Sequence, residues 1–475
     1  MSSNTPSEMQ EPSIDTDKLS YEIFSILESK FLFGYDDNQK LWIPKPISPP
    51  ASEPMVQPGD ENSLPAIKNQ RGKICILSID SGGMKGILCG KALAYLEKAL
   101  KSKSGNPNAR VADYFDVAAG SSVGGIFTAM LFATRDNNQP IFTAEETWRF
   151  LADNGKRIYR SGAGKNGGIL KKILKNGSTG SSSNGMEKAM KEAFTAGRRS
   201  LTLKDTLKPV LIPCYDLSST APFLFSRADA LETDSFDFPL WEVCRATSAE
   251  PGLSGPVLMQ SVDGQTKCVA VDGGLAMSNP TVAAITHVLH NKQEFPFVRG
   301  VEDLLVLSLG TGQLLEVSYE YEQVKNWRLK DWAKPMARIS GDGSADSVDQ
   351  TVAMAFQQCR SSNYVRIQEY LEVISLHVAL YDGTVKANGS SLGRCGPNVD
   401  TDPSPSNVKL LMEIGEEMLK QKNVESILFG GKRISEESNM EKLDWFAGEL
   451  VLEHQRRSCR IAPTVAFKQP SPKIN

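Results

Sequence analysis

Short apolar stretches that each end in a glycine-rich or acidic turn recur through the middle of this chain. Five of them stand out: ICILSI (74–79), YFDVAAG (114–120), KPVLIPCYDL (208–217), CVAVDGG (268–274) and DLLVLSLGTG (303–312). Nearly continuous apolar runs of this length are typical of strands that are buried on both faces of a parallel sheet. Segments with helical spacing of apolar residues lie between them, so we predict an α/β fold in which ligands bind at the carboxyl ends of the strands.

The chain divides into three parts by composition. Residues 1–72 form an N-terminal extension, with one predicted helix in 18–37 and seven prolines from 44 to 65 that indicate an extended linker. The α/β core is expected over 73–315, with its motifs within 76–284. Residues 316–475 contain stretches of helical periodicity such as NVKLLMEIGEEMLKQ, so we expect a mainly helical C-terminal part packed on the core.

The charge balance and the cysteine pattern exclude several classes of protein. A formal net charge of -3 argues against nucleic acid as the main partner, because phosphate binding usually requires a basic excess. The eight cysteines include no C-x-x-C pair, so we expect no zinc site. We find no basic start followed by an apolar run, and no apolar run near the roughly 20 residues that span a bilayer. We therefore expect a cytoplasmic protein that contacts membranes only peripherally.

The stretch GSSVG at 120–124 matches the pattern G-x-S-x-G. In this pattern a strand turns abruptly into a helix and the serine lies at the strained tip, with small residues two positions before and after it. Gly120 and Gly124 occupy those two positions, which makes Ser122 the candidate nucleophile. Ser121 is the neighbouring alternative, but it lacks the paired glycines.

A nucleophilic serine needs a base, and the chain has only four histidines. His287 and His290 lie three residues apart on a predicted helix, and neither His287 nor His377 follows a strand in a glycine-rich turn. A Ser-His-Asp triad is therefore poorly supported. A carboxylate can act directly when it lies within hydrogen-bond distance of the hydroxyl, and Asp272 at the end of an apolar strand is the candidate. An aspartate in such a place also commonly starts a turn.

The segment DSGGMKG at 80–86 follows the first apolar stretch and precedes a predicted helix. Consecutive glycines at a strand end can aim backbone N–H groups at one point, and the positive end of the following helix adds to this effect. The loop therefore suits a developing oxyanion, although a phosphate-binding turn has the same features. Lys85 is placed either to hold a neighbouring carbonyl group or to contact a phosphate headgroup.

These three turns, in this order, resemble the motifs of the patatin-like phospholipases, a family of lipid acyl hydrolases. The family's oxyanion loop D-G-G-G-x-[KR]-G, its G-x-S-x-G and its D-G-[GA] correspond to 80–86, 120–124 and 272–274. The stretches CRATSAEPG and VLSLGTG on either side of the aspartate match as well. The resemblance spans 73–312 and implies a three-layer α/β/α sandwich around a mostly parallel sheet.

The resemblance also implies a function and a set of site residues. Ser122 and Asp272 would form a Ser–Asp dyad that releases fatty acids from phospholipids and galactolipids at a bilayer surface, without a metal or cofactor. The residues implied for the oxyanion hole are Gly82, Gly83, Lys85 and Gly86, and those implied for the nucleophile turn are Gly120 and Gly124.

Two departures from the family pattern leave a second function open. Ser81 replaces the first loop glycine, so a positive φ there would be strained, and we expect Ser81→Gly to raise the rate modestly. The segment SAEPGLSGPV (248–257) also departs from the usual residues. Such changes suit a catalytically weak or inactive patatin-like protein that binds lipid or has a regulatory role. The segment at 18–37 resembles the third group of plant patatin-like proteins, whose members often lack the motif serine. This chain keeps Ser122, which argues for activity.

A basic stretch lies after the nucleophile motif. Residues 155–175 contain seven Lys or Arg and no acidic residue. Such a run is usually a solvated loop, but it also suits contact with anionic lipid, because each charge contributes about 1 kcal/mol near an anionic membrane.

Overall fold

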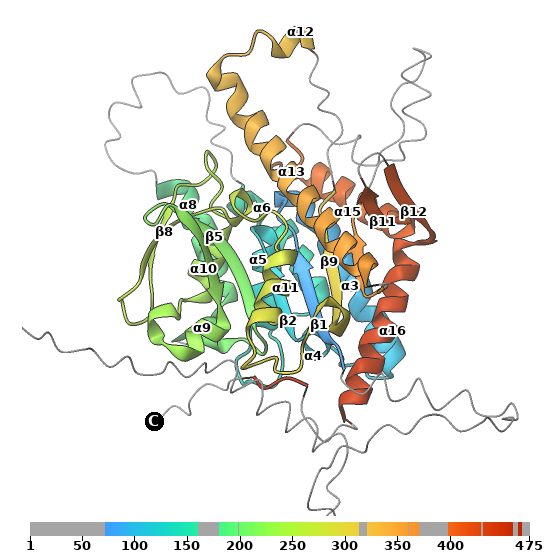
Figure 1. The fold of residues 1–475 in the computed structure, drawn as a ribbon. Coiled ribbons are helices and arrows are strands. Elements are labelled where there is room, and N and C mark those ends of the chain that lie inside the picture. Colours follow the sequence, from blue (N-terminus) through green and yellow to red (C-terminus); the bar gives the residue numbers. More distant parts are fainter. Residues whose placement is uncertain are drawn as a thin grey trace, which may run out of the picture.

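One eight-stranded sheet forms the centre of the computed structural model (Figure 1). The structure describes residues 72–159, 180–197, 199–312, 321–359, 361–369, 398–428, 431–458 and 464–467. The predicted N-terminal helix, the proline-rich segment, most of the basic stretch at 155–175, and His377 lie outside these ranges.

The central sheet is mostly parallel. Its strands follow the order β10-β9-β1-β2-β5-β8-β7, and β6 pairs with β5. The strands from β10 to β5 are parallel, whereas β6, β7 and β8 join antiparallel. The bounds are β1 (Ile74–Ile79), β2 (Val117–Gly120), β5 (Val210–Asp216), β6 (Ala221–Ser226), β7 (Val257–Gln260), β8 (Lys267–Val271), β9 (Leu304–Leu309) and β10 (Tyr364–Ile367). Each of the five apolar stretches coincides with one of these strands, so the predicted sheet is confirmed.

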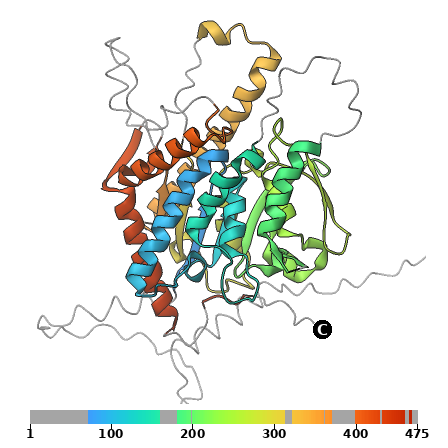
Figure 2. The same cartoon turned by 180° about the vertical axis from the view of Figure 1, so that it is seen from behind.

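Helices cover both faces of the sheet, because successive side chains of a strand point to opposite faces. On β1, Ile74 and Ile76 enter a smaller apolar cluster, and Leu77 and Ile79 enter a larger one. The smaller cluster is covered by α11 (Thr281–His290) and α13 (Leu329–Gln358). Helices of the opposite face, several of them in view in Figure 2, cover the larger cluster: α3 (Gly86–Ser104), α5 (Val123–Phe132), α6 (Ala144–Ile158), α8 (Gly180–Ala193), α10 (Leu240–Thr247), α15 (Pro405–Lys420) and α16 (Asn439–Ser458). The predicted three-layer α/β/α sandwich is confirmed.

The C-terminal part contributes strands as well as the expected helices. β10 forms an edge of the central sheet beside β9, and β11 (Lys422–Leu428) and β12 (Gly431–Ser438) form an antiparallel hairpin. Leu411 of α15 and Leu450 of α16 belong to the same apolar cluster as Leu77 of β1. Residues after 315 therefore share an apolar cluster with the core and supply one edge strand of its sheet.

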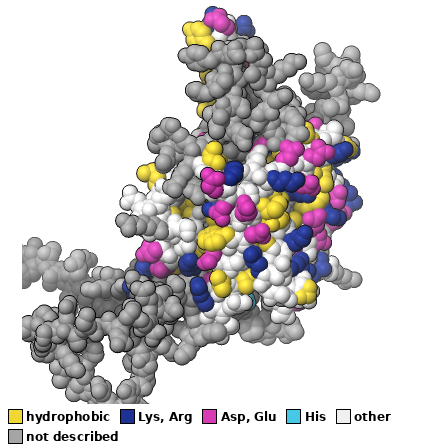
Figure 3. Space-filling view, turned by 90° about the vertical axis from the view of Figure 1, so that its right-hand side faces the viewer, with side chains coloured by type: hydrophobic (Ala, Val, Ile, Leu, Met, Phe, Trp, Pro, Cys, Tyr) yellow, Lys and Arg dark blue, Asp and Glu magenta, His cyan; other side chains and the backbone are white. Residues whose placement is uncertain are grey.

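Acidic and basic side chains are interspersed on the side of the molecule where α16 and the β11–β12 hairpin lie (Figure 3). Such mixing is typical of a surface that faces solvent. Within the described residues, none of the helices combines the length and the apolar character that crossing a bilayer requires.

The remaining elements are short. The short helices are α4 (Val111–Tyr114), α9 (Arg227–Glu232) and α12 (Tyr321–Val324), and the short strands are β3 (Thr195–Ala196) and β4 (Arg199–Ser200).

Candidate active site

Ser122 lies at a sharp turn between β2 and α5. Its backbone has φ 53° and ψ -121°, a strained conformation for a residue that carries a side chain. A Cβ atom on Gly120 would lie 2.1 Å from the carbonyl oxygen of Gly124, and one on Gly124 would lie 2.3 Å from that of Ile79. Glycine is therefore required at both motif positions, and the resulting turn presents Ser122 at the carboxyl edge of the sheet.

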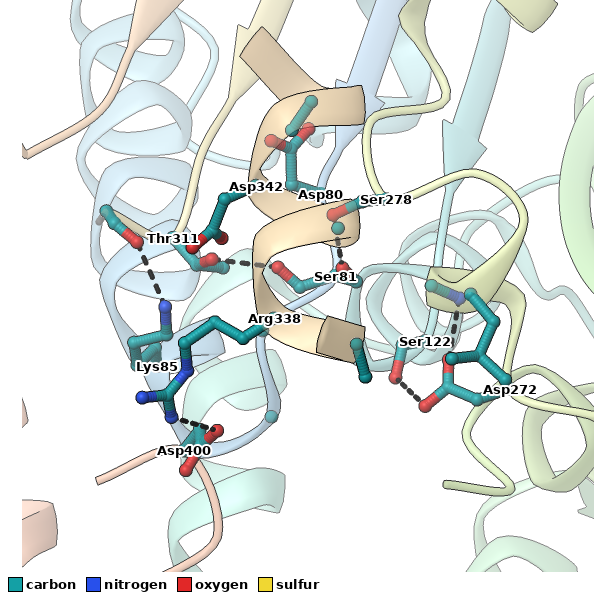
Figure 4. Close-up of a pocket in the computed structure, with 18 of the residues that line it drawn as sticks. Asp80, Ser81, Lys85, Ser122, Asp272, Ser278, Thr311, Arg338, Asp342 and Asp400 are labelled. Atoms are coloured by element: carbon teal, nitrogen blue, oxygen red, sulfur yellow. Dashed lines mark hydrogen bonds and ion pairs between the residues drawn. The ribbon is translucent and has the colours of Figure 1, made fainter. Parts of the chain in front are cut away.

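The hydroxyl of Ser122 donates a hydrogen bond of 3.1 Å to Oδ2 of Asp272, which directly follows β8 (Figure 4). The other carboxylate oxygen accepts a hydrogen bond of 2.7 Å from the amide of Gly274. Ser122 and Asp272 are only 6% and 7% exposed. The fold thus brings two predicted site residues within the distance needed for direct proton transfer.

Burial changes the acidity of Asp272. Removal from water raises the pKa of this carboxyl from 3.8 to about 6, and the hydrogen bonds from Gly274 and Ser122 oppose the shift. The carboxylate is therefore ionised at neutral pH, yet it binds a proton more tightly than an exposed aspartate does. A base of this strength is suited to accept the proton of a serine hydroxyl.

The loop after β1 places Gly82 and Gly83 in the lining of the same cavity as Ser122 and Asp272. Gly82 and Gly83 have φ of 154° and 58°, values that glycine adopts readily and other residues do not. Within the described part of the chain, no hydrogen bond uses the amide hydrogen of either glycine. The amides of Lys85 and Gly86 donate instead to carbonyl groups of their own turn. The amides of Lys85 and Gly86 are therefore already used within the loop, and those of Gly82 and Gly83 are the candidates left for the predicted oxyanion hole.

Lys85 contacts a carbonyl group rather than open solvent. Its ammonium group is buried and donates a hydrogen bond of 2.9 Å to the carbonyl oxygen of Gly312. Removal from water lowers the pKa of this lysine. Of the two roles expected from the sequence, the structure shows the carbonyl contact, which ties the end of the loop to the segment after β9.

These groups line a cavity of about 230 Å³. One wall comes from α13, which contributes Ala337, Arg338, Gly341 and Asp342 (Figure 4). Acidic side chains outnumber basic ones in the lining. The charged residues are Asp80, Glu250, Asp272, Asp342, Asp346 and Asp400, and Lys85, Arg338 and Arg366.

Known proteins resemble this chain over nearly its whole length. A sequence profile for the family described as patatin-like phospholipase matches residues 77–285, which include the three motifs. Patatin-like protein 6 of Arabidopsis thaliana is 68% identical over 472 residues, which cover 98% of this chain and 90% of that protein. The chain belongs to the patatin-like phospholipase family. This family is in general one of lipid acyl hydrolases.

Other patatin-like relatives carry different descriptions. Patatin-like protein 7 of Arabidopsis thaliana is 68% identical over 463 residues, which cover 97% of this chain and 86% of that protein. A further protein of the same plant, described as probable inactive patatin-like protein 9, is 41% identical over 381 residues, or 80% of this chain and 86% of that protein. Family membership alone therefore does not decide whether a patatin-like protein is active.

Thr247 is a contact of the patatin-like site that the sequence did not predict. Its hydroxyl oxygen, at the end of α10, accepts a hydrogen bond of 3.0 Å from the amide of Ser122. A Cβ atom on Gly273 would lie 2.8 Å from the same oxygen, so the hydroxyl lies between the nucleophile turn and the aspartate turn. The stretch CRATSAEPG matches the family pattern, but nothing in its spacing indicates a contact with a serine 125 positions earlier.

The prediction of backbone strain at Ser81, where this chain departs from the patatin-like pattern, is wrong. Positive φ falls on Gly82 and Gly83 and not on Ser81. The amide of Ser81 donates to the carbonyl of Ser278 at 2.9 Å, and the two hydroxyl oxygens lie 2.9 Å apart. The carbonyl of Ser81 accepts a hydrogen bond of 2.8 Å from Thr311. Serine is thus held in place by three contacts.

We accordingly expect Ser81→Gly to leave the maximal rate unchanged or to lower it by up to about tenfold. The variant loses one hydrogen bond, worth about 0.5–1.5 kcal/mol, and gains backbone freedom. Steady-state rates on a soluble ester measure the effect, and Ser278→Ala is the matched control because it removes the same hydroxyl contact from the other side. A rate above that of the wild-type protein would restore the strained-loop interpretation.

No histidine lines the cavity in the part of the chain that the structure describes. The ring of His287 packs against Phe295 with centroids 6.2 Å apart, and burial lowers the pKa of His287 to about 4. His454 lies against Tyr114, and His290 is exposed at the end of α11. Among the described residues, no three or more His, Cys, Asp or Glu side chains gather in a way that would hold a metal ion.

Proposed function

We propose that this patatin-like protein hydrolyses the fatty acyl esters of phospholipids and galactolipids, with Ser122 as nucleophile and Asp272 as general base. The observation that carries the proposal is the 3.1 Å hydrogen bond between these side chains at a buried, strained turn. The loop of Gly82 and Gly83 lines the same cavity. A nucleophile, a base and a pair of oxyanion donors are the parts that acyl transfer requires.

The proposed reaction has two steps, as in other enzymes that use a covalent nucleophile. Asp272 takes the proton of the Ser122 hydroxyl while Oγ attacks the ester carbonyl carbon. The carbonyl oxygen becomes negative and accepts hydrogen bonds from the amides of Gly82 and Gly83. The C–O bond to the glycerol side then breaks, and the lysolipid leaves with the proton from Asp272.

The second step releases the fatty acid. A water molecule gives its proton to Asp272 as its oxygen attacks the acyl group on Ser122. Collapse of this second oxyanion breaks the ester bond to Oγ, and the proton returns to Ser122. One water is consumed, and one fatty acid and one lysolipid are formed.

The size of the cavity supports a substrate that is presented from a lipid surface. At about 230 Å³ the cavity is smaller than the roughly 300–1,000 Å³ of sites that enclose a whole small molecule. We therefore expect the ester group to enter the cavity while most of the lipid remains outside it.

The acidic excess around the cavity predicts a headgroup preference. Asp342, Asp346 and Glu250 contribute negative charge at the cavity, and like charge disfavours an anionic headgroup. We expect phosphatidylcholine and galactolipid to be hydrolysed about tenfold faster than phosphatidylglycerol in matched micelles at low salt. The difference should shrink with added salt and in Asp342→Asn. Equal rates at low salt would contradict this charge effect without bearing on Ser122.

Release of fatty acid by the purified protein tests the proposed function. We expect wild-type protein to convert phosphatidylcholine into equal amounts of fatty acid and lysolipid, as measured by mass spectrometry. The description of one relative as probably inactive favours the second candidate, a lipid-binding protein without turnover. Binding to vesicles with no release of either product would support that alternative and contradict our proposal.

A further inference from the structure

Arg366 and Asp80 form a buried ion pair at the base of the oxyanion loop. Nη2 of Arg366 lies 2.6 Å from Oδ2 of Asp80, and the two side chains are 4% and 5% exposed. Asp80 directly follows β1, whereas Arg366 lies on β10, outside the residues that match the family profile. We infer, on the basis of the proposed function, that Arg366 is a positioning residue. It holds Asp80, and through Asp80 it holds the amides of Gly82 and Gly83 in place for catalysis.

The guanidinium group of Arg366 is held on more than one side. Nη1 donates a hydrogen bond of 2.7 Å to the hydroxyl of Ser308, and Nη2 also contacts the side-chain oxygen of Gln368. A Cβ atom on Gly310 would lie 2.6 Å from Nη2, so the guanidinium occupies space that only glycine leaves open. These contacts restrict the side chain to one position, and the carboxylate of Asp80 is placed against it.

A chain of buried hydroxyl groups extends this contact behind the loop. The hydroxyl oxygen of Ser308 lies 2.9 Å from that of Thr281, which lies 2.9 Å from that of Ser78. All three residues are fully buried. The network links β10, β9, the start of α11 and β1, which are the elements beneath the oxyanion loop. Hydrogen bonds in a low-dielectric interior are stronger than in water, so these contacts favour one arrangement of the parts they join. Oδ1 of Asp80 and Nε of Arg366 have no hydrogen-bond partner among the described residues.

The positive charge of Arg366 matters because Asp80 is removed from water. Burial raises the pKa of Asp80, and the guanidinium of Arg366 opposes the shift, as does the more distant Lys85, whereas Asp349 adds to it. Without the cation, the carboxyl group either takes up a proton or moves toward water. Either change acts on the backbone two residues before Gly82. A misplacement of about 1 Å can cost about 10²-fold in rate.

Arg366→Lys tests the inference. Lysine keeps the positive charge but lacks the pair of Nη groups that reach Asp80 and Ser308 together. For a soluble short-chain ester, we expect kcat to fall about 10²-fold while KM changes by less than about twofold. We also expect faster hydrogen exchange in residues 80–86 of the variant. In the wild-type structure the amide of Met84, within this segment, donates a hydrogen bond of 2.7 Å to the carbonyl of Asp400.

Arg457→Lys is the matched control, because it makes the same change to an ion pair at the opposite end of β1. Arg457 pairs with Asp116 through two contacts of 2.6 Å and donates to the carbonyl of Lys73. We expect this variant to lower the thermal midpoint while it leaves kcat and the exchange of residues 80–86 unchanged.

Wild-type kcat and wild-type exchange in Arg366→Lys would overturn the inference, and so would equal losses of kcat in the two lysine variants. If Arg366→Lys does not fold, the double variant Asp80→Asn/Arg366→Gln removes both buried charges and is measured against the same expectations. Wild-type kcat in the double variant would also overturn the inference. Hydrogen exchange does not depend on turnover, so the exchange of residues 80–86 tests the inference even if the protein is inactive. Absent acyl release from the wild-type protein would contradict the proposed function alone.

Discussion

Replacement of Ser122 by alanine is expected to abolish acyl release while the fold is retained. Loss of the nucleophile costs about 10⁶-fold in a well-characterised serine hydrolase. The hydroxyl makes one side-chain hydrogen bond, to Asp272, so little stability depends on it. Alanine at φ 53° is about as strained as serine, whereas glycine would relax the turn and is a poorer test. Fatty acid release from phosphatidylcholine micelles, together with the thermal midpoint, measures both parts of the expectation.

Ser121→Ala is the matched control for the nucleophile. Ser121 is fully buried, and its hydroxyl has no hydrogen-bond partner among the described residues. We therefore expect this variant to fold and to retain most of the wild-type rate. An inactive Ser121→Ala beside an active Ser122→Ala would show that the nucleophile is wrongly assigned.

Asp272→Asn is expected to lower kcat/KM by about 10³-fold, because asparagine keeps the shape of the side chain but cannot accept the proton. The wild-type protein should also lose activity as the pH falls through about 6. The base must be ionised, and burial raises the pKa of Asp272 to about 6. We expect this acidic limb to be absent from the residual activity of the variant. His287→Gln is the control, and loss of several decades of rate in that variant with its fold preserved would support a triad instead.

The same substitution is expected to stabilise the fold above pH 6. Burial raises the pKa of Asp272 in the folded state above its unfolded value, so folding favours the protonated form. Stability is therefore lost as the pH rises from about 4 to about 6, and above pH 6 the folded state holds a buried carboxylate. Asparagine removes this cost, which we put at about 1–3 kcal/mol. Denaturant unfolding at pH 4 and pH 8 measures it, and an equal effect at both values would contradict the assignment.

Local signals account for the parts of this fold that the sequence predicted. ICILSI reads as a buried strand because its apolar residues are consecutive, and it forms β1 with both faces covered. Gly120 and Gly124 predict the nucleophile turn because no other residue fits two positions from Ser122 on either side. These inferences needed only neighbouring residues. The order of the three motifs then indicated the family resemblance, and that resemblance predicted that Ser122 and Asp272 belong to one site.

Contacts between distant segments account for what the sequence did not predict. Arg366 lies 286 positions from Asp80, on a four-residue strand too short to give a clear pattern in a part expected to be mainly helical. Thr247 and Asp400 likewise reach the site from other elements. The error at Ser81 had another cause. A glycine in a family pattern shows that some loop residue needs positive φ, but here that need falls on Gly82 and Gly83.

Labelling with a fluorophosphonate, followed by mapping of the modified residue by tandem mass spectrometry, tests the central claim most directly. The reagent reacts with an activated serine hydroxyl, so it reports on the interaction between Ser122 and Asp272 rather than on any particular lipid. We predict a single adduct on Ser122, with a labelling rate that falls below pH 6 and drops sharply in Asp272→Asn. An adduct on Ser121 or on another residue, or no adduct on folded protein that still releases fatty acid, would contradict the proposed site.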